Sequence, residues 1–339
     1  MDIDVRGVTI GFGAAIVVLA ALVYVVGLDG VLAALALLGP QDIGLLVVTT
    51  AAYLVAWALA LRTVLSALDI DASIRESVLL FASATFANNI TPFGQAGGEP
   101  FSALLVSRAT GSEYESALAS MASIDTINFI PSIALSLLGL SYYVAVFAVG
   151  DRLLLVAAVV VALAIGVPLA GWGVWRVRHR VQSMAVRALH PVTRTLGELV
   201  PSWTVPERPH IRERVQGFFR AIERVAESRT TLAEALVLST AGWMAMAAAL
   251  YVSLAAVGHT VPVAAALIAA PVGAIASVTP LPGGLGGVEL AVVIIIVPIT
   301  SVSPEVAASA ALIYRGATYW LPTVAGGLST AWLEGRVTR

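Results

Sequence analysis

A few ionisable residues stand in stretches of the sequence that are otherwise apolar, and these residues have the clearest capacity for chemistry. They are Arg315 with Tyr319 four residues later, and the carboxylates Asp125, Glu99 and Glu289. Ionisable groups are costly inside a membrane, so those that are kept there are typical of substrate or ion pathways. A guanidinium holds a phosphate through two parallel hydrogen bonds. Arg315 therefore predicts phosphate recognition; the alternative is an ion pair of Arg315 with Asp125 or Glu289 that only fixes helix packing.

The depth of these groups follows from helix geometry. Asp125 lies thirteen residues after Ser112, about 20 Å along a helix. Arg315 lies twelve residues after Ser303, about 18 Å along its own helix. Both residues are expected near the middle of the membrane. Asn128, three residues after Asp125, shares its helix face.

Two proline- and glycine-rich breaks interrupt apolar stretches. Residues 91–99 read Thr-Pro-Phe-Gly-Gln-Ala-Gly-Gly-Glu, and residues 279–289 read Thr-Pro-Leu-Pro-Gly-Gly-Leu-Gly-Gly-Val-Glu. Proline removes an amide donor, and glycine permits backbone angles that other residues resist. A new helix is expected to begin at about Gly98 and at about Gly287. Free amides at such helix starts, with the positive end of the helix dipole, form a candidate anion site.

These considerations define a set of candidate residues. Those expected to bind substrate are Asn89, Thr91, Gln95, Gly97, Gly98, Thr279, Gly283, Gly284, Gly286, Gly287, Arg315 and Tyr319. Those expected to exchange a proton or coupling ion are Glu99, Asp125, Asn128 and Glu289. For Glu99 and Glu289, an ordinary complement to the helix dipole is the alternative. Asn89 and Gln95 are interpreted as amides that line the turn rather than incidental loop residues.

The two breaks belong to an internal repeat. Both contain Thr-Pro, a glycine pair and a glutamate. After each break a serine precedes the next helix, and a proline lies nineteen residues after that serine: Pro131 after Ser112 and Pro322 after Ser303. We predict a first repeat over residues 43–140 and a second over residues 232–335. Three crossings separate the two breaks, so the second repeat is inverted. Inverted repeats with broken helices near the midplane are typical of transporters.

The amino-acid composition indicates that these elements lie in a membrane. The 339 residues are 59% hydrophobic and 12% charged, with a mean hydropathy of +0.92, whereas soluble domains have about 25% charged residues. We predict an all-α polytopic membrane protein, a single membrane domain over residues 1–339, with six full spans plus two inverted broken-helix (re-entrant) hairpins. The hairpins are Val78–Arg108 and Val261–Thr300. The expected spans are Val8–Gly27, Ile43–Leu61, Ala117–Leu138, Leu153–Trp175, Leu232–Val257 and Val306–Leu333.

The charged connection over residues 176–230 sets the orientation. It holds eleven arginines and five glutamates, and the positive-inside rule places it in the cytoplasm. Crossings counted from there put both termini in the cytoplasm of a plasma (inner) membrane protein. We interpret the segment as an amphipathic connection on the membrane face. The more specific alternative is a basic surface helix that is attracted to anionic lipid headgroups. A homodimer is compatible with this architecture.

Residue types exclude several functions. The chain has no cysteine and no lysine, and its four histidines are scattered. Disulfides, thiol chemistry, a lysine Schiff base and the phosphate-binding lysine of a P-loop are therefore excluded. No nucleophile–base pair or metal-ligand spacing appears, so we expect no enzyme activity, metal or cofactor. The near-neutral formal charge of -2 argues against a nucleic-acid partner.

The same motifs resemble a known family. Asn-Ile-Thr-Pro-Phe-Gly from Asn89 with Gly98-Glu99, and residues 279–289 followed by Tyr314-Arg315, resemble the flippase-like membrane domain of lysylphosphatidylglycerol synthases and its free-standing bacterial and archaeal relatives. The resemblance covers nearly the whole chain. It implies a protein that moves a lipid headgroup between leaflets, without lysyl transfer, because these residues hold no aminoacyl-transferase domain. The family often carries Glu-Arg after the first motif, where this chain has Ser123-Ile124-Asp125.

The sequence therefore predicts a flippase for a phospholipid or polyprenyl-phosphate-linked headgroup, with the membrane lipid as partner. An ion-coupled carrier of a small soluble anion would use the same site behind a sealed vestibule. A membrane partner of a glycosyltransferase or synthase that transports nothing is the third hypothesis, and it predicts that Arg315 tolerates substitution.

Overall fold

The computed structural model describes residues 36–91, 94–146, 151–199, 208–279 and 281–337. All regular structure in these ranges is helical, which confirms the predicted all-α class. The span expected over residues 8–27 lies outside the described residues.

The first half of the described chain contains five helices. The N-cap serine of α4, Ser73, accepts a hydrogen bond from the amide of Glu76, whose carboxylate accepts one in return from the Ser73 amide. Such a reciprocal pair fixes where a helix begins. The helices are α3 (Pro40–Ala67), α4 (Ile74–Ile90), α5 (Gln95–Thr110), α6 (Tyr114–Val146) and α7 (Asp151–Arg176).

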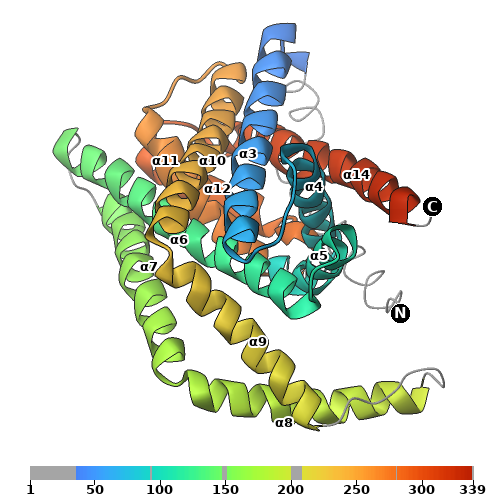
Figure 1. Cartoon of the computed structure of the whole chain (residues 1–339). Coiled ribbons are helices and arrows are strands. Elements are labelled where there is room, and N and C mark those ends of the chain that lie inside the picture. The colour runs from blue at the N-terminus through green and yellow to red at the C-terminus, as the bar shows by residue number, and fades with distance from the viewer. Residues whose placement is uncertain (1–35, 92–93, 147–150, 200–207, 280, 338–339) are drawn as a thin grey trace.

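The second half continues outside the bundle and then returns to it. Two amphipathic helices, α8 (Arg178–Leu199) and α9 (Arg208–Glu227), run along one end of the bundle (Figure 1). The chain then forms α10 (Arg229–Ala256), α11 (Val263–Ile275), the short 3-10 turns η1 (Ala276–Val278) and η2 (Pro282–Gly284), α12 (Gly287–Ile299), α13 (Pro304–Arg315), a π-helical turn η3 (Gly316–Trp320) and α14 (Leu321–Val337).

Within the described ranges, five helices are long and apolar enough to cross a membrane. They are Pro40–Ala67, Tyr114–Val146, Leu154–Arg176, Arg229–Ala256 and Pro282–Ile299. Four of these coincide with predicted spans, and the fifth lies in the second broken stretch. The span predicted over residues 306–333 is helical from α13 to α14, but the π-helical turn divides it. The chain is therefore a polytopic membrane protein.

The helices of the two halves pack against one another in matching pairs. α3 lies along α10, and theirs is the most extensive contact among the helices that the structure describes. The other large contacts between the halves join α4 to α14 and α6 to α11 (Figure 1). Each hairpin therefore has one arm packed against the long helical segment of the other half.

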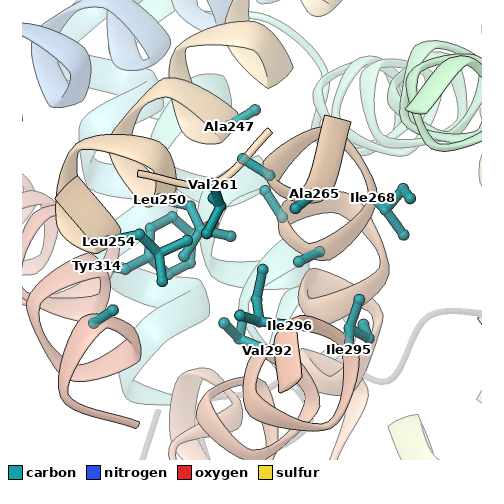
Figure 2. Close-up of a cluster of buried hydrophobic side chains, with 14 of the residues drawn as sticks. Ala247, Leu250, Leu254, Val261, Ala265, Ile268, Val292, Ile295, Ile296 and Tyr314 are labelled. Atoms are coloured by element: carbon teal, nitrogen blue, oxygen red, sulfur yellow. The ribbon is translucent and has the colours of Figure 1, made fainter. Parts of the chain in front are cut away.

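The core is built from small and branched apolar side chains. One buried cluster joins α10, α11, α12 and α13 through residues such as Leu250, Ile268, Ile296 and Tyr314 (Figure 2). Outward-facing apolar residues are also abundant: Leu155 on α7 is 63% exposed. An apolar outer surface of this kind suits contact with lipid.

Candidate functional site

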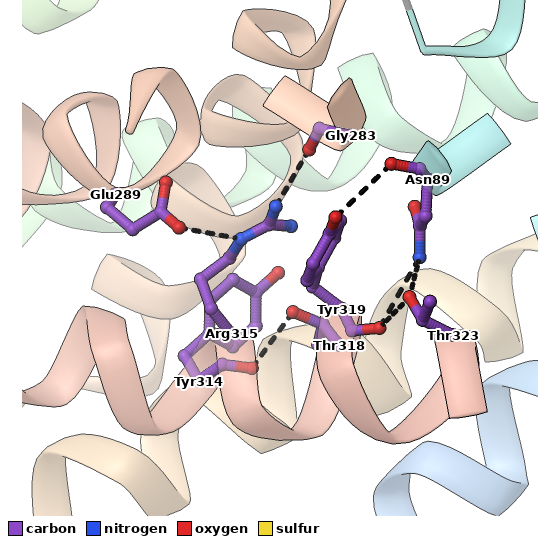
Figure 3. Close-up of polar contacts among 8 residues, drawn as sticks. All are labelled: Asn89, Gly283, Glu289, Tyr314, Arg315, Thr318, Tyr319 and Thr323. Carbon is purple, nitrogen blue, oxygen red and sulfur yellow. Dashed lines mark hydrogen bonds and ion pairs between the residues drawn. The ribbon is translucent and has the colours of Figure 1, made fainter. Parts of the chain in front are cut away.

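Arg315 lies at the centre of the candidate site. It ends α13 and is 7% exposed. Its guanidinium donates from Nε to Oε1 of Glu289 at 3.1 Å and from Nη2 to the carbonyl oxygen of Gly283 at 2.7 Å (Figure 3). Glu289 is 1% exposed. Of the two ion-pair partners considered from the sequence, the structure shows Glu289, and Asp125 contacts other groups.

Glycine lets the backbone of the second hairpin reach this guanidinium. Gly283, Gly284 and Gly286 have φ of +54°, +64° and +80°, a region that other residues rarely adopt. A Cβ atom on Gly284 would lie 2.4 Å from Cα of Ser277, and one on Gly283 would lie 2.2 Å from the ring of Tyr319. Only glycine fits at both close approaches.

The second hairpin also presents a helix start to the site. α12 begins at Gly287, as predicted, and its first backbone bond runs from the amide of Leu290 to the carbonyl of Gly286. The preceding amides of the first turn have no intrahelical acceptor. The free oxygen of the Glu289 carboxylate, Oε2, is buried without a hydrogen-bond partner among the described residues. The helix start and the guanidinium together can bind an anion that takes the place of the Glu289 carboxylate.

Tyr319 connects Arg315 to the first hairpin. The guanidinium lies 4.5 Å from the centre of the Tyr319 ring, a favourable cation–π distance. The Tyr319 hydroxyl donates to the carbonyl of Asn89 at 3.2 Å, and the Asn89 amide donates to Thr323 Oγ1 at 2.8 Å (Figure 3). Arg315 is the N-cap of the π-helical turn and Tyr319 lies within it; such a distortion is often found at functional sites.

The tips of the two hairpins lie against each other. Gly94, the N-cap of α5, has φ of +55°, and a Cβ atom there would lie 2.8 Å from the carbonyl oxygen of Ser277. A Cβ atom on Gly283 would lie 3.2 Å from the carbonyl oxygen of Asn89. The two glycine-rich turns, distant in sequence, therefore meet beside Arg315.

The first helix start is three residues earlier than predicted. α5 begins at Gln95 and not at about Gly98, because Gly94 makes the turn. The amides of Gly97 and Gly98 both donate to the carbonyl of Gly94, at 3.2 and 3.0 Å. These amides are therefore satisfied within the helix. Gly98 instead allows close packing, since a Cβ atom there would lie 2.6 Å from Cα of Asn88.

A second polar cluster involves Asp125 on α6. Gln95 Nε2 donates to Asp125 Oδ1 at 3.2 Å, and the carboxyl group of Glu99 lies near the Asp125 side chain. Asp125 Oδ2 is buried and accepts no hydrogen bond from any residue that the structure describes. A buried carboxyl oxygen without a hydrogen-bond donor is costly when the group is ionised, and a second carboxyl group nearby adds to this cost. The cluster is therefore a candidate site for a proton.

The other predicted site residues have structural contacts. Asn128 accepts a hydrogen bond from Ser239 and its carbonyl accepts one from Trp243, which joins α6 to α10. Thr91 donates to the carbonyl of Ala87 at 2.8 Å and closes the end of α4. Thr279 Oγ1 is buried without a partner within the described chain and lies near Gly287.

Sequence reasoning missed the contacts that α3 makes with the site. Thr50 donates to the carbonyl of Ala317 at 2.8 Å, and the Tyr53 hydroxyl donates to the carbonyl of Thr318 at 3.5 Å. Both carbonyls belong to the π-helical turn, where regular backbone hydrogen bonding is disturbed. The hydroxyl groups in an otherwise apolar span are the available signal, but the sequence does not show the π-helical turn that accepts their hydrogen bonds.

Comparison with known proteins identifies the family of the chain. The lysylphosphatidylglycerol synthase TM region family matches residues 8–326, which include both hairpins and Arg315. A UPF0104 membrane protein of Methanothermobacter thermautotrophicus is 28% identical over 98% of this chain and 95% of its own length. A UPF0104 membrane protein of Pyrococcus horikoshii is 23% identical over 80% of this chain and 81% of its own length. The resemblance drawn from the motifs is confirmed.

Proposed function

The chain belongs to the lysylphosphatidylglycerol synthase TM region family, and we propose that it is a lipid flippase. The substrate is a phospholipid or a polyprenyl-phosphate-linked headgroup, which the protein moves between membrane leaflets. The observation that carries this proposal is the buried Arg315–Glu289 pair at the contacting tips of two broken-helix hairpins. Buried ion pairs contribute little to stability, so a pair kept at this place suits a ligand site.

The proposed architecture is an inverted repeat of residues 43–140 and 232–335, with six full spans and two re-entrant hairpins. Matching contacts support it: α4 packs against α14, and α11 packs against α6. In this arrangement, the first hairpin enters from the cytoplasm and the second from the opposite side. Both termini and the basic segment 176–230 are cytoplasmic, in the plasma membrane.

Headgroup binding is an exchange of partners at Arg315. At rest, Glu289 and the carbonyl of Gly283 occupy the guanidinium. A headgroup phosphate replaces Glu289 and also faces the free amides at the start of α12. Since Glu289 and Tyr319 are each 1% exposed, the hairpin tips must separate to admit the headgroup. Movement of one repeat against the other provides this access from each side in turn.

The first repeat supplies the proton site of this mechanism. Asp125 lies thirteen residues after Ser112, and Arg315 lies twelve after Ser303, so the two residues lie at a similar depth on corresponding helical segments. Arg315 neutralises Glu289, whereas Asp125 lies near a second carboxyl group, that of Glu99. A proton on one of these two carboxyl groups reduces the charge of the pair, and its exchange couples headgroup movement to the proton gradient.

The test is headgroup translocation in proteoliposomes, measured with fluorescent phosphatidylglycerol and a fluorescent polyprenyl-phosphate sugar. Arg315→Gln is expected to slow translocation by at least about tenfold, the effect of losing one charge-assisted contact. Arg108→Gln is the matched control, because Arg108 is exposed in the last turn of α5. Thermal unfolding verifies that each variant is folded.

Equal rates for the wild type and Arg315→Gln would refute the proposed site. Transport of free phosphate but of neither lipid would favour the soluble-anion carrier instead. A folded Arg315→Gln variant that loses only lipid translocation is the expected outcome.

A further inference from the structure

A cavity of about 420 Å³ lies between α8 and α9, away from Arg315. α8 contributes His179, Gln182, Ser183 and Arg187, and α9 contributes Arg212 and Gln216. Small-molecule sites typically occupy about 300–1,000 Å³, so the space is large enough for a phosphorylated headgroup. α8 follows the end of α7 outside the helical bundle, and α9 runs from α8 back to the bundle, where it packs against α6 (Figure 1).

The arginines of this region separate into two groups. Arg178 pairs with Glu223 at 3.5 Å, Arg214 with Glu115 at 3.0 Å and Arg224 with Asp69 at 2.9 Å. These pairs hold α9 against α8, against α6 and against the turn after α3. Arg187 and Arg212, which line the cavity, form no ion pair within the described ranges. The structural pairs therefore leave the cavity-lining charges available.

The lining of the cavity is matched to a phosphate group. Two guanidinium groups, an imidazole, two amides and a hydroxyl surround it, and no carboxylate is among the lining residues. Guanidinium groups bind phosphate through paired hydrogen bonds, and amides and hydroxyls satisfy the remaining oxygens. Val186 and Val215 add apolar surface to the same cavity, which suits the glycerol region of a lipid.

The position of the cavity favours a lipid over a soluble anion. At the end of α7, Trp172 is 59% exposed and Trp175 is 39% exposed. The guanidinium groups of Arg176 and Arg178 lie 5.1 and 4.8 Å from these two rings. Exposed tryptophans with adjacent arginines mark the level of lipid headgroups. His179, which lines the cavity, directly follows Arg178, so the cavity lies close to the expected depth of the headgroups.

We propose that the α8–α9 cavity binds the phosphate headgroup of an anionic membrane lipid. The bound lipid joins α8 to α9 at the membrane face. This site is separate from the proposed transport site at Arg315 and does not depend on it.

The test measures binding of a fluorescent short-chain phosphatidic acid to the full-length protein in an uncharged detergent, by fluorescence anisotropy. The wild type is expected to bind this probe about tenfold or more tightly than the phosphatidylcholine analogue. The double variant Arg187→Gln with Arg212→Gln is expected to lose about tenfold or more in affinity. The matched control is Arg180→Gln with Arg220→Gln, which removes the same charge from exposed positions on the same helices outside the cavity.

Several results would overturn the proposal. Equal losses in the two double variants would show general attraction to a basic surface. Displacement of the probe by inorganic phosphate as readily as by unlabelled phosphatidic acid would assign the cavity to a soluble anion. Should the glutamine variant fail to fold, Arg187→Lys with Arg212→Lys keeps the charge. This variant is expected to bind more weakly than the wild type, and unchanged binding would contradict recognition by the guanidinium groups.

Discussion

The hydroxyl of Tyr319 donates a hydrogen bond to the backbone carbonyl of Asn89 at 3.2 Å, although 230 positions separate the two residues. Asn89 returns a hydrogen bond from its amide to Thr323. The last turn of α4 is thereby fastened to the segment that carries Arg315. Separation of the hairpin tips requires these bonds to break, so they stabilise the closed state.

Tyr319→Phe removes the hydroxyl and keeps the ring beside Arg315. We expect a loss of about 1 kcal/mol in stability, the value of a typical hydrogen bond, and a faster opening of the site. Tyr142→Phe is the control, since Tyr142 is 48% exposed. Thermal unfolding and translocation rates are the measurements. Equal behaviour of the two variants would show that the Tyr319 bond does not hold the closed state.

Arg315→Met with Glu289→Leu separates packing from function. Arg315→Met alone leaves the Glu289 carboxylate buried without a partner, which is expected to cost about 3–5 kcal/mol. Replacement of both charges by apolar groups is often neutral or stabilising. We therefore expect the double variant to regain thermal stability and still fail in headgroup translocation. Translocation at the wild-type rate would show that the pair serves packing alone.

Gly284→Ala tests the turn that brings the second hairpin to the site. Gly284 has φ of +64°, and its Cβ would lie 2.4 Å from Cα of Ser277. We expect a loss of about 1–3 kcal/mol from the unfavourable backbone conformation, with further loss from the clash. Gly171→Ala on α7 is the control, because its Cβ would meet no atom within 4 Å. A stable, active Gly284→Ala variant would contradict the described geometry of the turn.

Asp125→Asn tests the proposed proton site. The amide keeps a hydrogen-bonding side chain near Glu99 and removes the carboxyl group that would carry the proton. Translocation is expected to become independent of an imposed proton gradient, while the folded protein remains stable. Asp71→Asn changes an exposed aspartate in the loop before α4 and serves as control. A gradient response that survives in Asp125→Asn would remove this carboxyl pair from the coupling mechanism.

Local chemistry made parts of the site predictable. The start of α12 at Gly287 follows from proline and glycine immediately before it, and so does the place of Glu289 in the first helical turn. Burial of Arg315 follows from the apolar residues around it. In each case, the determinants lie within a few residues of the feature.

Contacts between segments that are distant in the sequence are harder to predict from the sequence. Glu289 and Asp125 were equally reasonable partners for Arg315, and only the packing of α12 beside α13 selects Glu289. The start of α5 was misplaced because the pair Gly97 and Gly98 resembles a helix break. The structure uses Gly94 for the turn. The contact of Asp125 with Glu99 likewise depends on how α5 lies on α6.

The central claim, that two oppositely oriented hairpins meet within the membrane, has a direct measurement. The chain has no cysteine, so single cysteines can be labelled with a membrane-impermeant thiol reagent from either side of the membrane. Glu113→Cys, just before α6, and Glu305→Cys, in the first turn of α13, probe exposed positions at the starts of the two corresponding helical segments. Ser277→Cys probes the tip of the second hairpin. We predict labelling of Glu113→Cys only from the cytoplasm, labelling of Glu305→Cys only from outside, and protection of Ser277→Cys from both sides. Labelling of Glu113→Cys and Glu305→Cys from the same side, or free labelling of Ser277→Cys, would contradict the account.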